Sequence, residues 1–279
     1  MRKRNRKTNH KTILLLLIAF AAAVFLFSLF KVIRITRTYQ EAASLYGEVE
    51  SLVGPAGEEG EDWGTDPVTG EKLKYSSLSW DYPALLELCG DAAGYIYQKD
   101  VLSYPVVQAE DNDKYLRHLL NGEYNIAGTL FVDARYPEGL DGRYSIIYGH
   151  NMDDGSMFGS ITSYKDEDYY KAHPEWELYI GEDCYTYHVL AAFETEAEGF
   201  AFQFEPLSDE EFLELVREAK ELCPYETDAP EIMKDSVVTV LSTCIDYPRD
   251  YNYRFVVFLV REEKLLNRNN HYKNKSDTN

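Results

Sequence analysis

Three residues that lie far apart in the sequence have the right types to perform acyl transfer together. His150 lies in the segment Tyr-Gly-His-Asn-Met at 148–152, Cys244 ends the segment Leu-Ser-Thr-Cys at 241–244, and Arg254 follows ten residues later. A thiolate is a nucleophile, an imidazole exchanges protons with it, and a guanidinium holds a developing oxyanion. Chemistry through a thioester requires these three parts, so the sequence predicts an enzyme.

The local context of these residues supports this interpretation. Cys244 and His150 each end an apolar, strand-like run, and Arg254 begins another. A side chain at the end of a strand that opens into a loop is accessible to a substrate. By residue type alone, His150 and Arg254 each have an ordinary non-catalytic explanation. A histidine in a surface loop is common, and a buried ion pair would also explain an arginine on an apolar face.

Short strand-like segments dominate the chain beyond residue 92. Each is rich in β-branched and aromatic residues between turn signals, at 94–97, 104–107, 128–132, 144–148, 185–190, 236–243 and 253–261. Helices are predicted at 83–89 and at 208–222, where Ser208 and Glu211 form a capping box. Many short strands with few helices favour a mainly β fold, namely a closed β-barrel with peripheral helices.

The N-terminal region predicts a membrane anchor. Residues 13–30 are apolar except for Ser28, and residues 32–35 extend this run to the length of a membrane-spanning helix. Six cations and no acid precede it, which by the positive-inside rule keeps that end cytoplasmic. A cleaved signal peptide has the same charge pattern, but this apolar run is longer than usual and no small-x-small site directly follows it. We therefore expect a single-pass protein of the cell membrane with an extracellular catalytic domain.

The charge distribution argues against nucleic acid as a partner. The 279 residues carry a formal net charge of −20, yet residues 1–37 hold nine Lys and Arg and no acid, which leaves −29 on the remainder. Such a domain repels phosphate backbones and anionic membrane surfaces. Solubility outside the cell explains the acidity.

Composition divides the chain into five segments. The acidic stretch contains Gly and Pro and few core-forming residues, so it is expected to be a loose stalk. The segments are a cytoplasmic basic segment at 1–12, a transmembrane anchor at 13–35, the acidic stalk at 36–78, the catalytic domain at 79–264 and a polar tail at 265–279.

The cysteines and acids give no sign of a metal or another cofactor. Four dispersed cysteines allow three disulfide pairings and show no metal-binding spacing: Cys89, Cys184, Cys223 and Cys244. For Cys89 and Cys223 the role of a small buried apolar residue is favoured. The run Asp-Asn-Asp at 111–113 starts like a calcium loop, but Tyr115 and Leu116 stand where an EF-hand needs an oxygen ligand and a glycine.

Three separated motifs, in the right order, resemble the class B sortases. They are Tyr-Pro-Val-Val-Gln-x-x-Asp-Asn-x-x-Tyr-Leu at 104–116, Tyr-Gly-His-Asn-Met-Asp-Asp-Gly-Ser-Met-Phe-Gly at 148–159, and Leu-Ser-Thr-Cys at 241–244 with Arg254 beyond it. The match spans roughly residues 85–261 and includes the helix at 208–222, which resembles the extra helix of that class. The resemblance implies the sortase type of β-barrel.

The resemblance also implies an activity. It is that of a membrane-anchored cysteine transpeptidase that cleaves a C-terminal sorting motif of exported surface proteins after Thr, forms a thioacyl-enzyme, and transfers the acyl group to an amine of the peptidoglycan precursor. By position it makes Cys244 the nucleophile, His150 the acid–base partner and Arg254 the cation that holds the oxyanion and orients the substrate. It also implies four residues that line the substrate groove, Asn112, Leu116, Tyr148 and Ser242. It implies no metal, and Ile245 departs from the acid that some members carry there.

Two other functions remain open. An extracellular cysteine peptidase would hydrolyse the thioester with water, although papain-like chains place Cys before His and carry a Cys-Gly-Ser-Cys-Trp-type signature, unlike this sequence. A non-catalytic, membrane-tethered peptide-binding module would use the same barrel without a reactive thiol. Product analysis with and without an amine tests the first alternative, and iodoacetamide labelling of Cys244 tests the second.

Overall fold

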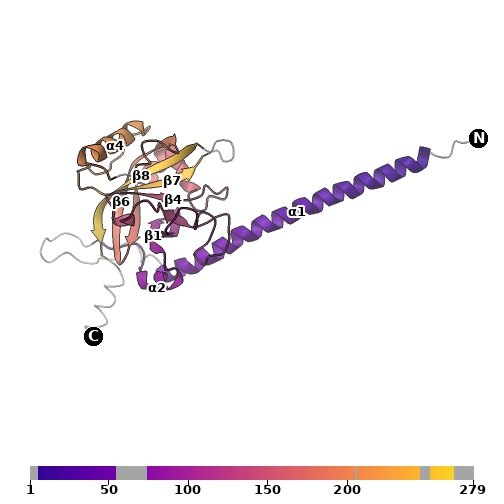
Figure 1. The fold of residues 1–279 in the computed structure, drawn as a ribbon, viewed down its shortest axis with the longest axis horizontal. Coiled ribbons are helices and arrows are strands. Elements are labelled where there is room, and N and C mark those ends of the chain that lie inside the picture. The colour runs from indigo at the N-terminus through magenta and orange to yellow at the C-terminus, as the bar shows by residue number, and fades with distance from the viewer. Residues whose placement is uncertain (1–5, 55–73, 205, 246–251, 267–279) are drawn as a thin grey trace, which may run out of the picture. The chain divides into compact units, whose positions relative to one another are not determined.

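Two units make up the chain in the computed structural model, which describes residues 6–54, 74–204, 206–245 and 252–266. The units are residues 1–44 and residues 45–279. Helix α1, Arg6–Val53, begins in the first unit and ends in the second (Figure 1). The second unit contains all the strands described below.

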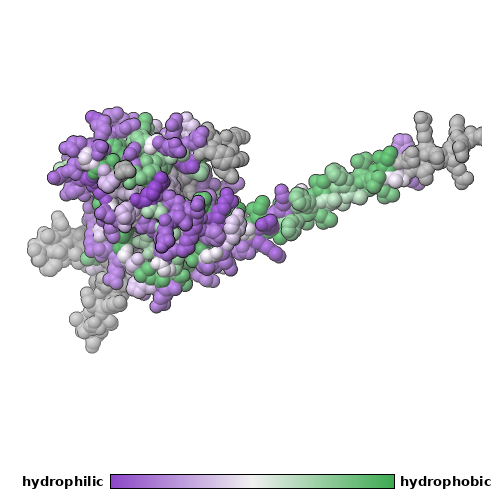
Figure 2. Space-filling model, viewed as in Figure 1, coloured by the Kyte–Doolittle hydropathy of each residue, from purple (hydrophilic) through white to green (hydrophobic). Residues whose placement is uncertain are grey.

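The described part of the first unit consists of α1 alone. Its large apolar side chains from Ile13 to Ile35 are exposed, and Figure 2 shows them as a band of apolar surface along the helix. Among the described residues one helix, over His10–Val53, is long and apolar enough to cross a membrane. A membrane anchor and an N-terminal signal sequence both have this length and composition.

The helix continues where the charge pattern predicts a loose stalk. Residues 36–53 are helical, and the compact second unit begins at Leu45 instead of at residue 79. Tyr46, Val49 and Val53 lie on one face by helical spacing and are buried. The glutamates between them lie on the exposed side of the helix. This end of α1 therefore has an apolar face despite its many acids. Residues 55–73 of the predicted stalk lie outside the described residues.

Hydrogen bonds join this last part of α1 to the rest of the second unit. The buried hydroxyl of Tyr46 donates to the carbonyl oxygen of Gly128 and lies 3.0 Å from the Thr129 hydroxyl. Its ring also packs edge-on against Tyr104, with 5.2 Å between the ring centroids. Residues 45–53 are therefore part of the folded domain.

Eight strands form a closed barrel in the order β1-β2-β3-β4-β7-β8-β6-β5. Their bounds are β1 Ala92–Gln98, β2 Leu102–Val107, β3 Leu130–Val132, β4 Tyr144–Tyr148, β5 Glu175–Ile180, β6 Asp183–Glu196, β7 Val238–Cys244 and β8 Tyr253–Leu265. Neighbouring strands are antiparallel except for the parallel pairs β2–β3 and β4–β7. Because β1 also pairs with β5, the sheet has no free edge. The predicted mainly β fold with a closed barrel is confirmed.

Short helices surround the barrel. They are α2 Tyr82–Leu88, α3 Glu167–Ala172, α4 Asp209–Leu222 and the 3₁₀ segments η1 Gly139–Asp141 and η2 Ser160–Lys165. Helix α4 begins at the predicted capping box, in which the Ser208 hydroxyl accepts the N–H of Glu211 and the Glu211 carboxylate accepts the N–H of Ser208. An N-cap of this kind stabilises a helix by about 1 kcal/mol.

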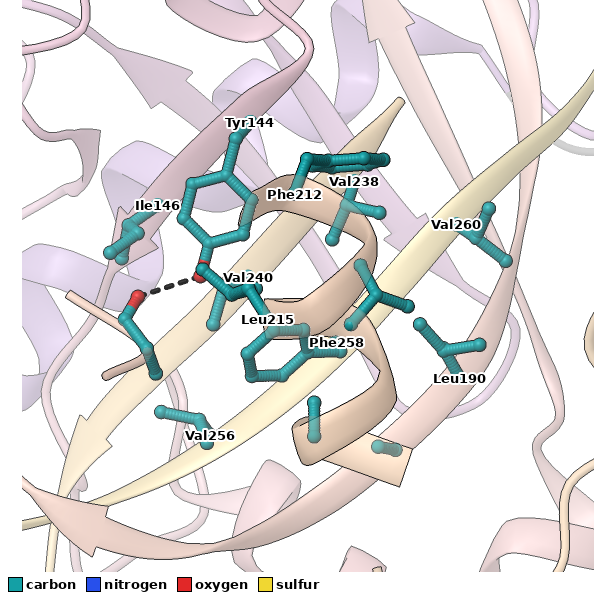
Figure 3. Close-up of a cluster of buried hydrophobic side chains, with 14 of the residues drawn as sticks. Tyr144, Ile146, Leu190, Phe212, Leu215, Val238, Val240, Val256, Phe258 and Val260 are labelled. Atoms are coloured by element: carbon teal, nitrogen blue, oxygen red, sulfur yellow. Dashed lines mark hydrogen bonds between the residues drawn. The ribbon is translucent and has the colours of Figure 1, made fainter. Parts of the chain in front are cut away.

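Helix α4 packs on a cluster of buried side chains from β4, β6, β7 and β8, as Figure 3 shows. The apolar side of the helix carries Phe212, Leu215 and Val216, all buried. They pack against buried strand residues that include Tyr144, Ile146, Val238, Val240, Val256, Phe258 and Val260. Each such side chain stabilises the fold by about 1.5–3 kcal/mol when it leaves water. This packing holds the three strands that carry the candidate site.

Candidate active site

Strand pairing places residues of β4, β7 and β8 in straight rows on the face that α4 covers. Residues paired across neighbouring strands share a face, and every second residue along a strand returns to that face. Three rows follow from the pairings, Tyr144–Val238–Val260, Ile146–Val240–Phe258 and Tyr148–Ser242–Val256. The first two belong to the apolar cluster under α4, and the third lies at its end.

The next row contains the three candidate catalytic residues. Cys244, at the end of β7, pairs with Arg254 on β8. Tyr148 on β4 pairs with Ser242 on β7. His150 lies two residues beyond Tyr148, and Cys244 lies two residues beyond Ser242. The N–H of Gly149 donates to the carbonyl of Ser242 at 3.1 Å, which continues the register past the end of β4. His150, Cys244 and Arg254 therefore occupy neighbouring positions across three strands.

Hydrogen bonds hold the segment after β4 beside β7. The Thr243 hydroxyl donates to the carbonyl of Gly149 at 2.8 Å, and the side-chain amide of Asn151 donates to the carbonyl of Cys244 at 2.9 Å. Gly149 must be a glycine, because a Cβ there would lie 2.4 Å from a methyl carbon of Leu130. The backbone at His150 is thus fixed relative to the backbone at Cys244.

The orientation of the His150 ring is set by a backbone carbonyl. Its Nε2 lies 2.7 Å from the carbonyl oxygen of Leu116. A carbonyl only accepts, so Nε2 carries the hydrogen and Nδ1 is the nitrogen left for proton transfer. Burial lowers the pKa of His150 below its ordinary value, against the opposing effect of the Leu116 carbonyl. The neutral imidazole is favoured near neutral pH.

The other two members of the row are both partly buried. Cys244 is a free thiol, as are Cys89, Cys184 and Cys223, so no disulfide blocks the candidate nucleophile. The Nη1 of Arg254 donates a hydrogen bond to the carbonyl oxygen of the preceding residue, Tyr253, at 2.9 Å. Burial is the main cause of the raised pKa of Tyr148, and the positive charge of Arg254 is a minor effect in the opposite direction. The guanidinium therefore acts on the adjacent row.

The row below the candidate residues contains two of the predicted groove residues. Tyr148 and Ser242 are paired on β4 and β7. Ser242 is buried, and its hydroxyl has no hydrogen-bond partner among the described residues. A buried hydroxyl without a partner costs about 1–3 kcal/mol.

The loop between β2 and β3 contributes the remaining predicted residues. Leu116 exposes its side chain while its carbonyl holds His150. The Asn112 side chain accepts the N–H of Ala134 at 2.8 Å, and it also hydrogen-bonds the carboxylate of Asp133. Hydrogen bonds and strand pairing thus group the predicted residues as His150 with Leu116, Tyr148 with Ser242 and, through Asp133, with Asn112, and Cys244 with Arg254.

One residue at this site went unnoticed in the sequence. Asp133 directly follows β3, its side chain is fully buried, and it accepts hydrogen bonds from Tyr148, Arg135 and Asn112. Its only sequence signal is an acid at the end of the apolar run Leu-Phe-Val, two residues before an arginine.

The described acids do not assemble a metal site. Among the described residues, no group of three or more His, Cys, Asp or Glu side chains has a suitable arrangement. Asp111, in the segment that starts like a calcium loop, uses one carboxylate oxygen to accept the N–H groups of Asp113 and Lys114 at 2.9 and 2.8 Å.

Comparison with solved structures identifies the class of fold. The crystal structure of sortase B from B. anthracis superimposes with a TM-score of 0.64 at 27% sequence identity, over 82% of this chain and 100% of that chain. The closed barrel of this chain is therefore a sortase fold.

Curated relatives identify the family. Sortase B of Listeria monocytogenes is 34% identical over 168 residues, which cover 60% of this chain and 68% of the relative. Sortase B of Staphylococcus aureus is 27% identical over 177 residues, covering 63% and 72%. No protein-family model matches the chain. The chain belongs to the class B sortases, a family of cysteine transpeptidases.

Proposed function

We propose that this protein cleaves a C-terminal sorting motif of exported surface proteins after Thr and transfers the acyl group to an amine of the peptidoglycan precursor. The row His150–Cys244–Arg254 carries this proposal, because it unites a nucleophile, a proton carrier and an oxyanion-stabilising cation at one edge of the barrel.

In the proposed first half-reaction, Nδ1 of His150 takes the proton of the Cys244 thiol, and the resulting thiolate attacks the Thr carbonyl carbon. The carbonyl oxygen becomes an anion that the Arg254 guanidinium stabilises. The proton on Nδ1 of His150 moves to the departing amine, the C–N bond breaks, and a thioester to Cys244 remains. The Leu116 carbonyl assists, because it keeps Nε2 occupied and Nδ1 available.

The second half-reaction reverses these roles. An amine of the cell-wall precursor attacks the thioester carbonyl, and His150 accepts the proton that the amine loses. The oxyanion again faces Arg254, and Cys244 leaves as the thiolate when the C–S bond breaks. Asn112, Leu116, Tyr148 and Ser242 are proposed to line the groove for the sorting motif, without a metal or cofactor in the reaction.

The N-terminal helix is proposed to anchor the enzyme with the catalytic domain outside the cell. The exposed apolar side chains of residues 13–35 and the basic segment before them support a single-pass protein with a cytoplasmic N-terminus. The strong negative charge of the second unit argues against nucleic acid as a partner. Protease added to intact cells should degrade the domain and spare the N-terminal segment. Protection of the domain would contradict the orientation.

The test of the activity uses full-length protein in detergent micelles and a library of fluorescence-quenched sorting-motif peptides. We expect cleavage after Thr, a peptide–amine product by mass spectrometry when an amine acceptor is added, and complete loss of turnover in Cys244→Ala. A Cys223→Ala variant is the matched control and keeps its activity. Hydrolysis that is unchanged by the acceptor would instead indicate a peptidase, and turnover by Cys244→Ala would refute the proposed nucleophile.

A further inference from the structure

A fully buried carboxylate lies beside the proposed groove without belonging to the catalytic row. Asp133 follows β3, and its N–H bonds the carbonyl of Ile146 on β4 at 3.0 Å. Its side chain has no exposed surface. An isolated buried carboxylate is unfavourable by several kcal/mol, so its partners must compensate for the lost hydration.

The partners of Asp133 come from three different directions. Arg135 donates from its backbone N–H and from Nε to one carboxylate oxygen, each at 2.9 Å, and from Nη2 to the other. The Tyr148 hydroxyl donates to that second oxygen at 3.0 Å. Asn112 also hydrogen-bonds the carboxylate. Burial alone would raise the pKa of Asp133. The hydrogen bonds outweigh burial, so the pKa is lowered. Asp133 is therefore ionised at neutral pH.

These contacts tie together three segments that border the proposed groove. Tyr148 belongs to β4, two residues before His150, and Asn112 belongs to the loop that presents Leu116. Arg135 extends the connection to the segment before α4, because its guanidinium lies 3.2 Å from the centroid of the Phe204 ring. Arg135 and Phe204 also line a cavity of about 230 Å³. One carboxylate thus fixes the relative positions of two loops and a strand end.

The hydroxyl of Tyr148 has a single orientation in this arrangement. Its ring packs against Phe131, with 5.4 Å between centroids, and its hydroxyl is directed at Asp133. Burial first, and then the negative charge and hydrogen bond of Asp133, raise the pKa of Tyr148. The hydrogen bond to Asp133 holds the neutral Tyr148 ring in one orientation. The same face of the ring is therefore presented to any peptide that lies over Tyr148 and Ser242.

We propose that Asp133 is a positioning residue for substrate recognition, which fixes Tyr148 and Asn112 as one wall of the sorting-motif groove. This assignment rests on the proposed function. Asp133 does not touch the catalytic row, so its loss should weaken peptide binding and leave the chemistry of Cys244 intact.

Steady-state kinetics test the positioning role. The substrate is the quenched peptide that the full-length wild-type protein cleaves fastest, and the variants are Asp133→Asn and Tyr148→Phe. Each should raise KM about tenfold and change kcat less than twofold, since the loss of one hydrogen bond to a charged group has this magnitude. The double variant should show little further increase, because both changes remove the same contact. Asp141→Asn, which removes one exposed carboxylate, is the matched control and keeps the wild-type KM.

Two results would overturn the proposal. One is a KM within twofold of wild type in both single variants. The other is a parallel fall of kcat and of the iodoacetamide labelling rate of Cys244, because that pattern indicates a general structural role for Asp133.

A second measurement needs no turnover and so separates this proposal from the proposed function. With 3-fluorotyrosine at position 148, whose ring fluorine brings the phenol titration into an accessible pH range, Asp133→Asn should shift the ¹⁹F titration midpoint to lower pH. Loss of the neighbouring anion favours the phenolate, which gives the shift its sign. An unchanged midpoint would refute the contact even if no peptide were cleaved. A shift combined with an inactive wild-type enzyme would refute the proposed function alone.

Discussion

Replacing Ser242 with alanine should make this protein more stable and a poorer enzyme. The Ser242 hydroxyl is buried in the row below Cys244 and has no hydrogen-bond partner among the described residues. Such a group has lost its hydration without compensation, at a cost of about 1–3 kcal/mol. The Ser242→Ala variant removes one oxygen atom and with it most of this cost, because the void that remains is smaller than a methyl group.

The matched control is Ser145→Ala on the neighbouring strand. Ser145 is as deeply buried, but its hydroxyl lies 3.3 Å from the hydroxyl of Thr239. Its loss leaves Thr239 without that partner and should lower the free energy of unfolding by about 1 kcal/mol. The two serine-to-alanine changes are chemically identical, so only the hydrogen bonding of the hydroxyl differs between them.

Differential scanning fluorimetry of the full-length protein measures both effects. For a domain of this size, 1 kcal/mol corresponds to about 2–4 °C in Tm, so Ser242→Ala should raise Tm by at least about 2 °C and Ser145→Ala should lower it by a similar amount. The KM for the sorting-motif peptide should rise in Ser242→Ala alone. A fall in Tm for Ser242→Ala equal to that of Ser145→Ala would show that the hydroxyl is satisfied in solution and refute the reasoning.

Three further outcomes are expected. Arg254→Lys should lower kcat about 10²–10³-fold in peptide cleavage, because a point charge does not replace the planar fork at the oxyanion, whereas Arg217→Lys on the exposed face of α4 should have no effect. Because the pKa of His150 is lowered on folding, wild type should lose stability relative to His150→Gln as the pH falls below about 6.5, measured as the difference in Tm. A constant difference would contradict a neutral, partly buried ring. Tyr46→Phe should lower the free energy of unfolding by about 1–3 kcal/mol in chemical denaturation, since the Gly128 carbonyl loses its donor, and an unchanged midpoint would place residues 45–53 outside the folded domain.

The sequence predicted the elements that have strong local signals. Seven of the eight strands contain segments expected from β-branched and aromatic runs, and α4 begins at its predicted capping box. Strand β5 was missed, because Glu175 and Glu177 interrupt its apolar residues. Glu177 is nevertheless well placed there, since its carboxylate accepts the N–H and hydroxyl of Ser77. The pairing that makes this acid acceptable is non-local and leaves no trace in the segment itself.

The same reasoning explains what was found and missed at the site. His150, Cys244 and Arg254 were singled out because residue type and strand-end position are local properties, and the resemblance united them. Asp133 was missed because its importance depends on the pairing of the three-residue strand β3 with β4, which brings the carboxylate to Tyr148. The helical end of α1 was missed because its acids obscured the spacing of the buried residues. The catalytic roles themselves stay predictions until the kinetic variants are measured.

The parallel pairing of β4 with β7 has a consequence for the newly made chain. These strands are separated by more than half of the barrel sequence, and closing so long a loop is entropically costly, so this pairing is expected to form late in folding. Until it forms, the Cys244 thiol and the His150 imidazole, 94 residues apart (244 − 150), are not held near each other. The pairing that brings His150 and Cys244 to neighbouring positions also closes the barrel, so the proposed catalytic row is assembled only when the fold is completed.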